Sequence, residues 1–131
     1  MSGEKDLTQL IKNMNPELRD GEFVFASLDR KDVKSKGLNP VFTFIEDEGL
    51  SLIIRQMDAE INNIPYDSVF KMITLNIHSS LNAVGFFAVI LNELAKQNIS
   101  VNPVSAFYHD HLFIPKEKAE TAMVVLRKIT I

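Results

Sequence analysis

The stretch that decides the fold is Val69-Phe70-Lys71-Met72-Ile73-Thr74-Leu75-Asn76-Ile77, in which side chains of two kinds alternate. One face of an extended chain carries Ile73, Leu75 and Ile77, and the other carries Met72, Thr74 and Asn76. This alternation predicts a strand. A short turn, His78-Ser79-Ser80, follows it, and the apolar-rich residues from there to about Gln97 predict a long helix.

Four more elements follow this helix. Ile99 to Tyr108 predicts a strand with Pro103 at an edge position, since proline has no N–H for a ladder. We expect His109-Asp110-His111 to turn the chain into the strand 112–114, and Pro115 to open a helix. Residues 129–131 predict a last short strand. The order β-α-β-β-α-β predicts a ferredoxin-like α+β fold, with two helices on one face of an antiparallel sheet.

The first half of the chain has a similar but less regular order. A helix is expected after Asp6 as its N-cap, then a strand at 23–28, two strands at 41–45 and 50–54, and a helix at 57–63. Glu46-Asp47-Glu48-Gly49 predicts a hairpin turn between the two middle strands. We therefore expect two lobes, a degenerate one over residues 1–67 and a complete one over residues 68–131.

Composition excludes several classes of function. The 131 residues include no cysteine, so disulfides and thiolate zinc sites are excluded. The net charge of -3 gives no electrostatic basis for binding nucleic acid. The longest apolar run, 83–91, is too short to cross a membrane, and the polar start of the chain has no secretory signal. We expect a cytoplasmic protein with no membrane partner.

The long helix is apolar on two sides. The stripe expected to face the core consists of Leu81, Val84, Phe87, Ala88, Leu91, Leu94 and Ala95. Phe86, Val89 and Ile90 lie on the opposite side, where a surface helix is normally polar. This pattern predicts a second packing partner for Phe86 and Ile90, either the other lobe or another copy of the chain in a homo-oligomer.

Several stretches together resemble ACT domains. They are residues 77–87, with Val84-Gly85 after a small-residue turn, residues 99–105, residues 108–115 and, in the first half, residues 42–50. In this order they are similar to small bacterial tandem ACT-like proteins, and to the ACT lobes of aspartate kinases and cytosolic arginine sensors. The resemblance implies a regulatory protein that binds a small molecule, usually an amino acid, between ACT lobes.

The resemblance also implies where that ligand lies. The turn between the first strand and first helix corresponds to His78, Ser79, Ser80, Leu81, Val84 and Gly85, and the second strand to Asn102 and Val104. Free N–H groups at a helix N-terminus suit an α-carboxylate, and Gly85 allows close approach. The alternative is a protein–protein interaction module that binds no ligand.

Other chemistry has less support from the residues. His109 and His111, with His78, could converge on a metal, but no closed four-ligand set is present, so we expect neither metal nor cofactor. Ser79 and Ser80 fit N-capping better than nucleophilic catalysis, which needs a base and an orienting acid. With no catalytic motif in the sequence, we do not expect an enzyme.

Overall fold

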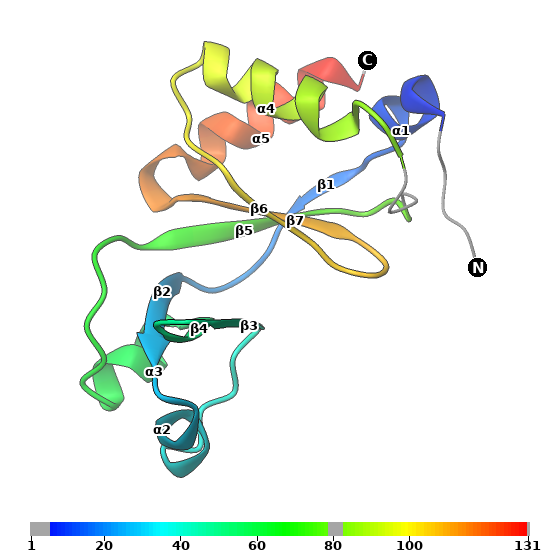
Figure 1. Cartoon of the computed structure of the whole chain (residues 1–131). Coiled ribbons are helices and arrows are strands. Elements are labelled where there is room, and N and C mark those ends of the chain that lie inside the picture. Colours follow the sequence, from blue (N-terminus) through cyan, green and yellow to red (C-terminus); the bar gives the residue numbers. More distant parts are fainter. Residues whose placement is uncertain (1–5, 79–82, 131) are drawn as a thin grey trace. The chain divides into compact units, whose positions relative to one another are not determined.

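The computed structural model describes residues 6–78 and 83–130 (Figure 1). Its contacts divide the chain into two compact units. The small unit is Gly21–Phe70, and the large unit combines the residues up to Asp20 with those from Lys71 onward. Helix α1 (Leu7–Lys12) and strand β1 (Pro16–Leu18) thus belong with the second half of the chain. The expected lobes were two consecutive segments, 1–67 and 68–131. The units differ from them because the large unit also includes the residues up to Asp20.

The small unit contains a three-stranded ladder and two short helices. Its elements are β2 (Phe23–Leu28), α2 (Arg30–Ser35), β3 (Phe42–Glu46), β4 (Gly49–Arg55) and α3 (Gln56–Ile61). Strand β4 lies between β2 and β3 and is antiparallel to both. Phe70, the first residue of β5 (Phe70–Leu75), pairs antiparallel with Phe23 and so supplies the start of a fourth strand. The expected hairpin between β3 and β4 is confirmed.

The large unit has the strand order β1-β5-β7-β6. Its remaining elements are α4 (Phe86–Lys96), β6 (Asn102–Ser105), β7 (Asp110–Pro115), a 3-10 turn (Lys116–Lys118) and α5 (Ala119–Ile129). The predicted strand at 129–131 is wrong for its described residues, because α5 continues through Ile129 and Thr130 caps it. Strand β1, which is antiparallel to β5, takes the outer position beside β5 instead. Ile131 lies outside the described residues.

Helices α4 and α5 lie on one side of the large unit's strands (Figure 1). Their buried side chains pack with Ile73 and Leu75 of β5, Leu112 and Ile114 of β7, and with α1. The face predicted for α5 is confirmed, since Ala119, Ala122, Met123 and Leu126 are all buried. Edge-strand geometry for Pro103 is also confirmed, because β6 ends the sheet.

Helix α4 turns a different face to the core from the one predicted. Phe86, Ile90 and Leu94, at i, i+4 and i+8, are buried in the core of the large unit. Val84 is 84% exposed and precedes the helix, and Ala88 and Ala95 are also exposed. The expectation that another lobe or copy buries Phe86 and Ile90 is therefore wrong. When a helix has apolar residues on two sides, the sequence pattern does not determine which side faces the core, and packing with neighbouring elements decides it. Because α4 begins only at Phe86, its buried stripe is Phe86, Ile90 and Leu94.

The hairpin between β6 and β7 is centred earlier than predicted. Ser105 pairs with Asp110, and the N–H of Ala106 donates to the carbonyl of His109 at 3.0 Å. Asp110 and His111 therefore lie within β7, and the turn falls at residues 107–108. None of the helices in the described ranges is long and apolar enough to cross a membrane.

Candidate functional site

The connection from β5 to α4 is the site that the sequence predicted. Gly85 is the N-cap of α4 and has a φ of 87°, in the left-handed region that glycine tolerates best. The first helical bond runs from the N–H of Val89 to the carbonyl of Gly85 at 3.2 Å. The free N–H groups of the first turn therefore begin at Phe86, after the predicted site residues Val84 and Gly85. Ser79, Ser80 and Leu81 lie outside the described residues.

An aromatic cluster in the large unit joins this connection to the β6–β7 turn. The ring of His78 lies 5.3 Å from Tyr108 and 6.1 Å from Phe107, and the rings of Phe107 and Tyr108 are 4.9 Å apart. Phe107 and Tyr108 are 58% and 56% exposed. Such faces can stack against the ring, apolar stem or cationic group of a ligand. Neither residue was predicted to belong to the site, although adjacent aromatics in a turn are a signal that could have found them.

The two strand residues predicted for the site lie at different distances from this cluster. Asn102 begins β6 and donates its side-chain N–H to the carbonyl of Phe113 at 3.4 Å. Asn102 lies five positions before Phe107, or at most roughly 17 Å if the chain were extended throughout. Val104, opposite His111 in the ladder, is three residues from Phe107 and about 10 Å away on the same scale. Val104 is thus the closer of the two along β6.

The histidines of β7 form a separate pair. The rings of His109 and His111 are 6.4 Å apart, and His111 Nδ1 lies 2.9 Å from Thr74 Oγ1 on β5. Burial lowers the pKa of His111 below its ordinary value of 6.5, and the charges of His109 and Arg19 lower it further. Within the described ranges, no three His, Asp or Glu side chains are arranged to hold a metal ion.

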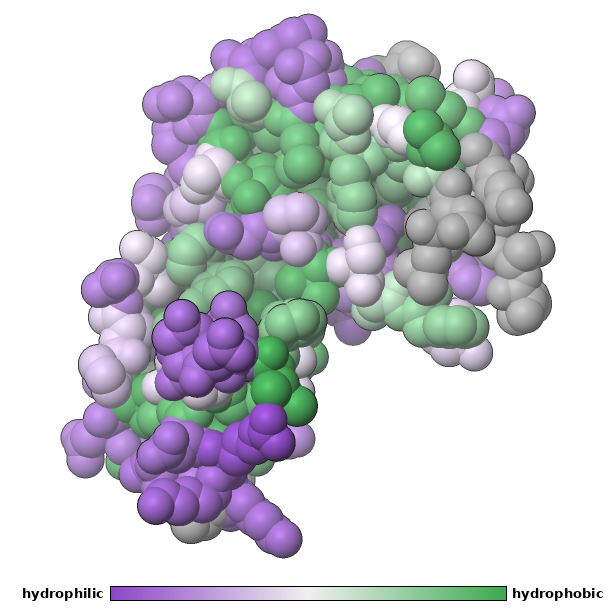
Figure 2. Space-filling view, in the orientation of Figure 1, coloured by the Kyte–Doolittle hydropathy of each residue, from purple (hydrophilic) through white to green (hydrophobic). Residues whose placement is uncertain are grey.

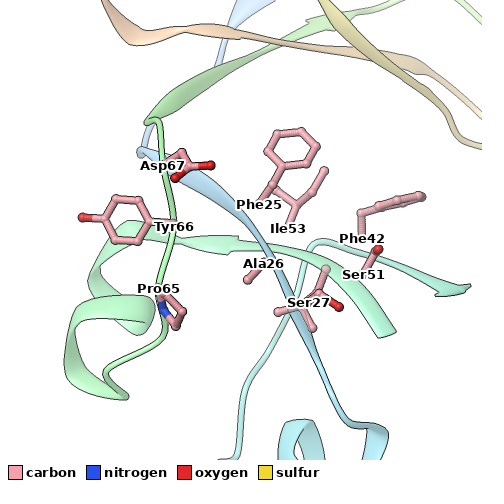
Figure 3. A pocket seen from close by; sticks show the side chains of 10 residues that line it. Phe25, Ala26, Ser27, Phe42, Ser51, Ile53, Pro65, Tyr66 and Asp67 are labelled. Carbon is pink, nitrogen blue, oxygen red and sulfur yellow. The ribbon is translucent and has the colours of Figure 1, made fainter. Parts of the chain in front are cut away.

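The small unit has a cavity of about 420 Å³ beside strand β2, which Figure 3 shows from close by. It is lined by Phe25, Ala26, Ser27, Phe42, Ser51, Leu52, Ile53, Pro65, Tyr66 and Asp67. The carboxylate of Asp67 points toward Phe25 in Figure 3, while the Tyr66 hydroxyl points away. That hydroxyl accepts a 2.9 Å hydrogen bond from Gln56 Nε2 and donates to Glu60. Tyr66 therefore lines the cavity without directing its hydroxyl into it. Asp67 is the acidic residue of the cavity's lining.

The cavity combines an apolar body with few polar groups. Phe25, Phe42 and Ile53 supply the apolar surface, and Ser27, Ser51 and Asp67 supply hydroxyls and a charge. The Ser51 hydroxyl already donates to the Glu46 carboxylate. Cavities of this size and lining suit small molecules with one cationic or polar end. No sequence pattern indicated this site, because its lining comes from four separate segments of the chain.

Comparison with protein families places both halves of the chain in one family. A model described as "ACT domain" matches residues 2–71, and a second model with the same description matches residues 68–128. The chain belongs to the ACT-domain family. The two ACT matches overlap at residues 68–71, where β5 begins.

Solved structures include one similar in sequence as well as fold. A protein of unknown function from Vibrio cholerae is 37% identical, with a TM-score of 0.86, over 97% of this chain and 98% of that one. An Agrobacterium tumefaciens protein is 16% identical over 88% of this chain and 87% of that one, with a TM-score of 0.65. The regulatory subunit of aspartate kinase from Thermus thermophilus is 10% identical, with a TM-score of 0.65, over 90% and 98%. These last two likenesses show the ACT fold alone. No curated protein matches the chain in sequence.

ACT domains are regulatory, and the tandem arrangement predicted from the sequence is confirmed. Each of the two structural units contains a feature that could hold a ligand. In the large unit it is the connection before α4, with His78 and the aromatic turn. In the small unit it is the cavity beside β2.

Proposed function

We propose that this chain is a cytoplasmic regulatory protein that binds an amino acid and functions as a homo-oligomer. The observation that carries the proposal is the pair of ACT matches, which together span residues 2–128. Both matches are to regulatory domains. The chain's effect would therefore be exerted through ligand-dependent contacts with other copies or other proteins.

The proposed ligand site is the connection before α4. The α-carboxylate would accept hydrogen bonds from the free N–H groups of the first turn of α4, where the positive end of the helix dipole lies. The side chain of the ligand would lie against His78, Phe107 and Tyr108. Ser79 and Ser80 are proposed to add hydroxyl donors, and Val104 to supply apolar contact. Each charge-assisted hydrogen bond is worth roughly 1.5–3 kcal/mol.

The test is a thermal-shift screen of the full chain against the twenty common amino acids, followed by calorimetry with any that stabilise it. A ligand that binds only the folded state at about 100 times its Kd adds about 2.7 kcal/mol of stability. His78→Ala should abolish binding if the ligand lies before α4, and Asp67→Asn should leave it intact. The opposite result would move the site to the small-unit cavity. A screen with no stabilising amino acid would overturn the proposal and favour the ligand-free interaction module.

A further inference from the structure

The sheet of the small unit has two different faces. On one face, Val24 packs in a core with Val33 of α2 and Ala59 of α3. Because side chains alternate along a strand, Phe25 and Ser27 project from the opposite face, where they line the cavity. In Figure 2, hydrophobic surface lies beside hydrophilic surface in the part of the view where Figure 1 places β3, β4 and α2. The cavity therefore lies on the face of the sheet opposite the unit's two helices.

The strand register places the apolar side chains of the cavity in one row. Phe25 of β2 is the partner of Ile53 on β4, and Ile53 is the partner of Phe42 on β3. Partners in an antiparallel pair share a face and have Cβ atoms about 4.5–5.5 Å apart. Ile53, the middle member, is 1% exposed, so it forms the floor of the cavity. Phe70 packs edge-to-face against Phe25 with ring centroids 5.0 Å apart, which restrains that ring.

The backbone of β2 adds hydrogen-bonding groups on the side where residues 65–67 line the cavity. The N–H of Gln56 donates to the carbonyl of Glu22 at 2.9 Å, which fixes the phase of the β2–β4 ladder. Alternate residues of such a ladder direct both backbone groups to the same neighbour, so Ser27 directs its N–H and C=O away from β4. Within the described ranges, β5 pairs with β2 at Phe23 alone. The carbonyl of Ser27 is thus an acceptor at this side of the strand.

The charge beside the cavity is negative. The lining includes the carboxylate of Asp67, which points toward Phe25 in Figure 3, and it includes no lysine, arginine or histidine. Neither ion pair found among the described residues involves this carboxylate. The Ser51 hydroxyl, also in the lining, donates to a second acid, Glu46. The hydrogen bonds of the Tyr66 hydroxyl to α3 hold the segment that carries Asp67, so the acid is positioned before any ligand arrives.

We propose that this cavity is a second ligand site, which takes a primary amine with an apolar stem and no carboxylate. The protonated amine would donate to the Asp67 carboxylate and to the Ser27 carbonyl. Its stem would lie on Ile53, between Phe25 and Phe42. An α-carboxylate would meet no cationic side chain here and would lie beside an acid, so a free amino acid fits this cavity less well. The amine site is therefore distinct from the amino-acid site proposed before α4.

Calorimetry with phenethylamine tests the ligand class, using the full chain in its His78→Ala form. This variant lacks the ring proposed to contact an amino acid before α4, so binding at that site does not interfere. Phenethylamine should bind. Phenylpropionate has a carboxylate in place of the ammonium, and phenylalanine adds a carboxylate to the same amine. Both should bind at least about tenfold more weakly. No binding of phenethylamine, or equal binding of phenylpropionate, would overturn the proposal.

Two variants test the location of the amine. Asp67→Asn should weaken binding about fivefold, or 1 kcal/mol, because an ion pair with an exposed carboxylate is worth up to about that much. The matched control is Asp47→Asn, which makes the same charge change in the exposed β3–β4 turn, outside the lining, and should leave binding unchanged. Equal effects of the two variants would overturn the contact with Asp67. Ser27→Phe fills the cavity from an exposed strand position and should abolish binding, and a folded Ser27→Phe chain that still binds phenethylamine would overturn the location.

The two proposed sites fail separately. In the chain with both sites intact, His78→Ala should remove the amino acid alone, and Asp67→Asn should weaken the amine alone. Loss of both ligands in either variant would mean one shared site and would overturn the proposal of a second one. Failure of the amino-acid screen would count against the site before α4 only, because phenethylamine is measured in a chain that lacks His78.

Discussion

The conformation of Gly85 makes a quantitative prediction for the site. With φ at 87°, a residue with a Cβ is strained there, at a cost of about 1–2 kcal/mol. A Cβ added at Gly85 would lie 3.6 Å from Leu7 Cδ2, which is ordinary contact, so no clash adds to the strain. Alanine also restricts the unfolded chain, which offsets about 0.4–1 kcal/mol. We expect Gly85→Ala to lower the free energy of unfolding by about 1 kcal/mol.

Asparagine provides the matched control, because it tolerates the left-handed region better than other residues with a Cβ. The chain itself places asparagine at three such positions, Asn15, Asn63 and Asn98. Gly85→Asn should therefore recover at least half of the loss that Gly85→Ala causes. Urea unfolding followed by circular dichroism measures both, and for a chain of this length about 1 kcal/mol lowers Tm by roughly 3–5 °C.

Two results would refute this reasoning. If Gly85→Asn were as destabilising as Gly85→Ala, the cost would come from crowding rather than from φ. If neither variant changed stability, the connection before α4 would not hold the conformation described. Calorimetry on the same variants separates strain from ligand contact, since Gly85→Leu would combine both effects.

Two other predictions concern the large unit. Ile90→Ala should lower the free energy of unfolding by about 2–5 kcal/mol, because Ile90 is fully buried. The control Ala88→Ser, at an exposed position of the same helix, should lower it by under about 1 kcal/mol. Equal losses for the two variants in urea unfolding would contradict the burial of Ile90. For His111, a pKa below 6.5 means that the unfolded chain binds its proton more readily. Stability from this residue is complete above about pH 6.5 and is lost as pH falls toward the folded-state pKa. Unfolding at pH 7 and pH 5 should show a smaller pH dependence in His111→Gln than in the wild type, and an unchanged dependence would exclude His111 as its source.

Local signals in the sequence predicted most elements correctly. The Asp6 side chain accepts a hydrogen bond from the N–H of Gln9 at 3.2 Å, as an N-cap should. The period-two pattern of β5 placed Ile73 and Leu75 in the core, although Thr74 on the other face is buried as well, and the helical stripe of α5 identified its buried face. In each case, one face is clearly more apolar than the other, so the pattern alone decides the orientation.

The errors arose where local signals were ambiguous or non-local. Helix α4 has apolar residues on two sides, and packing against α1 and α5 selected Phe86 and Ile90. The turn at residues 107–108 is aromatic, so a more polar segment, His109 to His111, was chosen in its place. The outer strand of the large unit comes from residues 16–18, which no pattern within residues 68–131 could reveal. The candidate site before α4 lies on one segment and could be proposed from the sequence, whereas the small-unit cavity could not.

The division of the chain bears on how a signal could pass between its parts. The large unit begins before Asp20 and resumes at Lys71, so the small unit is inserted into it and joined by two connections. Leu10 and Met14 are fully buried in the large unit's core, and burial of each is worth roughly 1.5–3 kcal/mol. This is a large share of the 5–15 kcal/mol that usually stabilises a domain.

The large unit therefore depends on residues from both ends of the chain. Both points where the small unit begins and ends are continuous with the large unit. In a simple tandem array of lobes 1–67 and 68–131, one linker would join the lobes, whereas here there are two connections. Phe70 pairs with Phe23, two residues after Gly21, so both connections enter the small unit at the same end of strand β2.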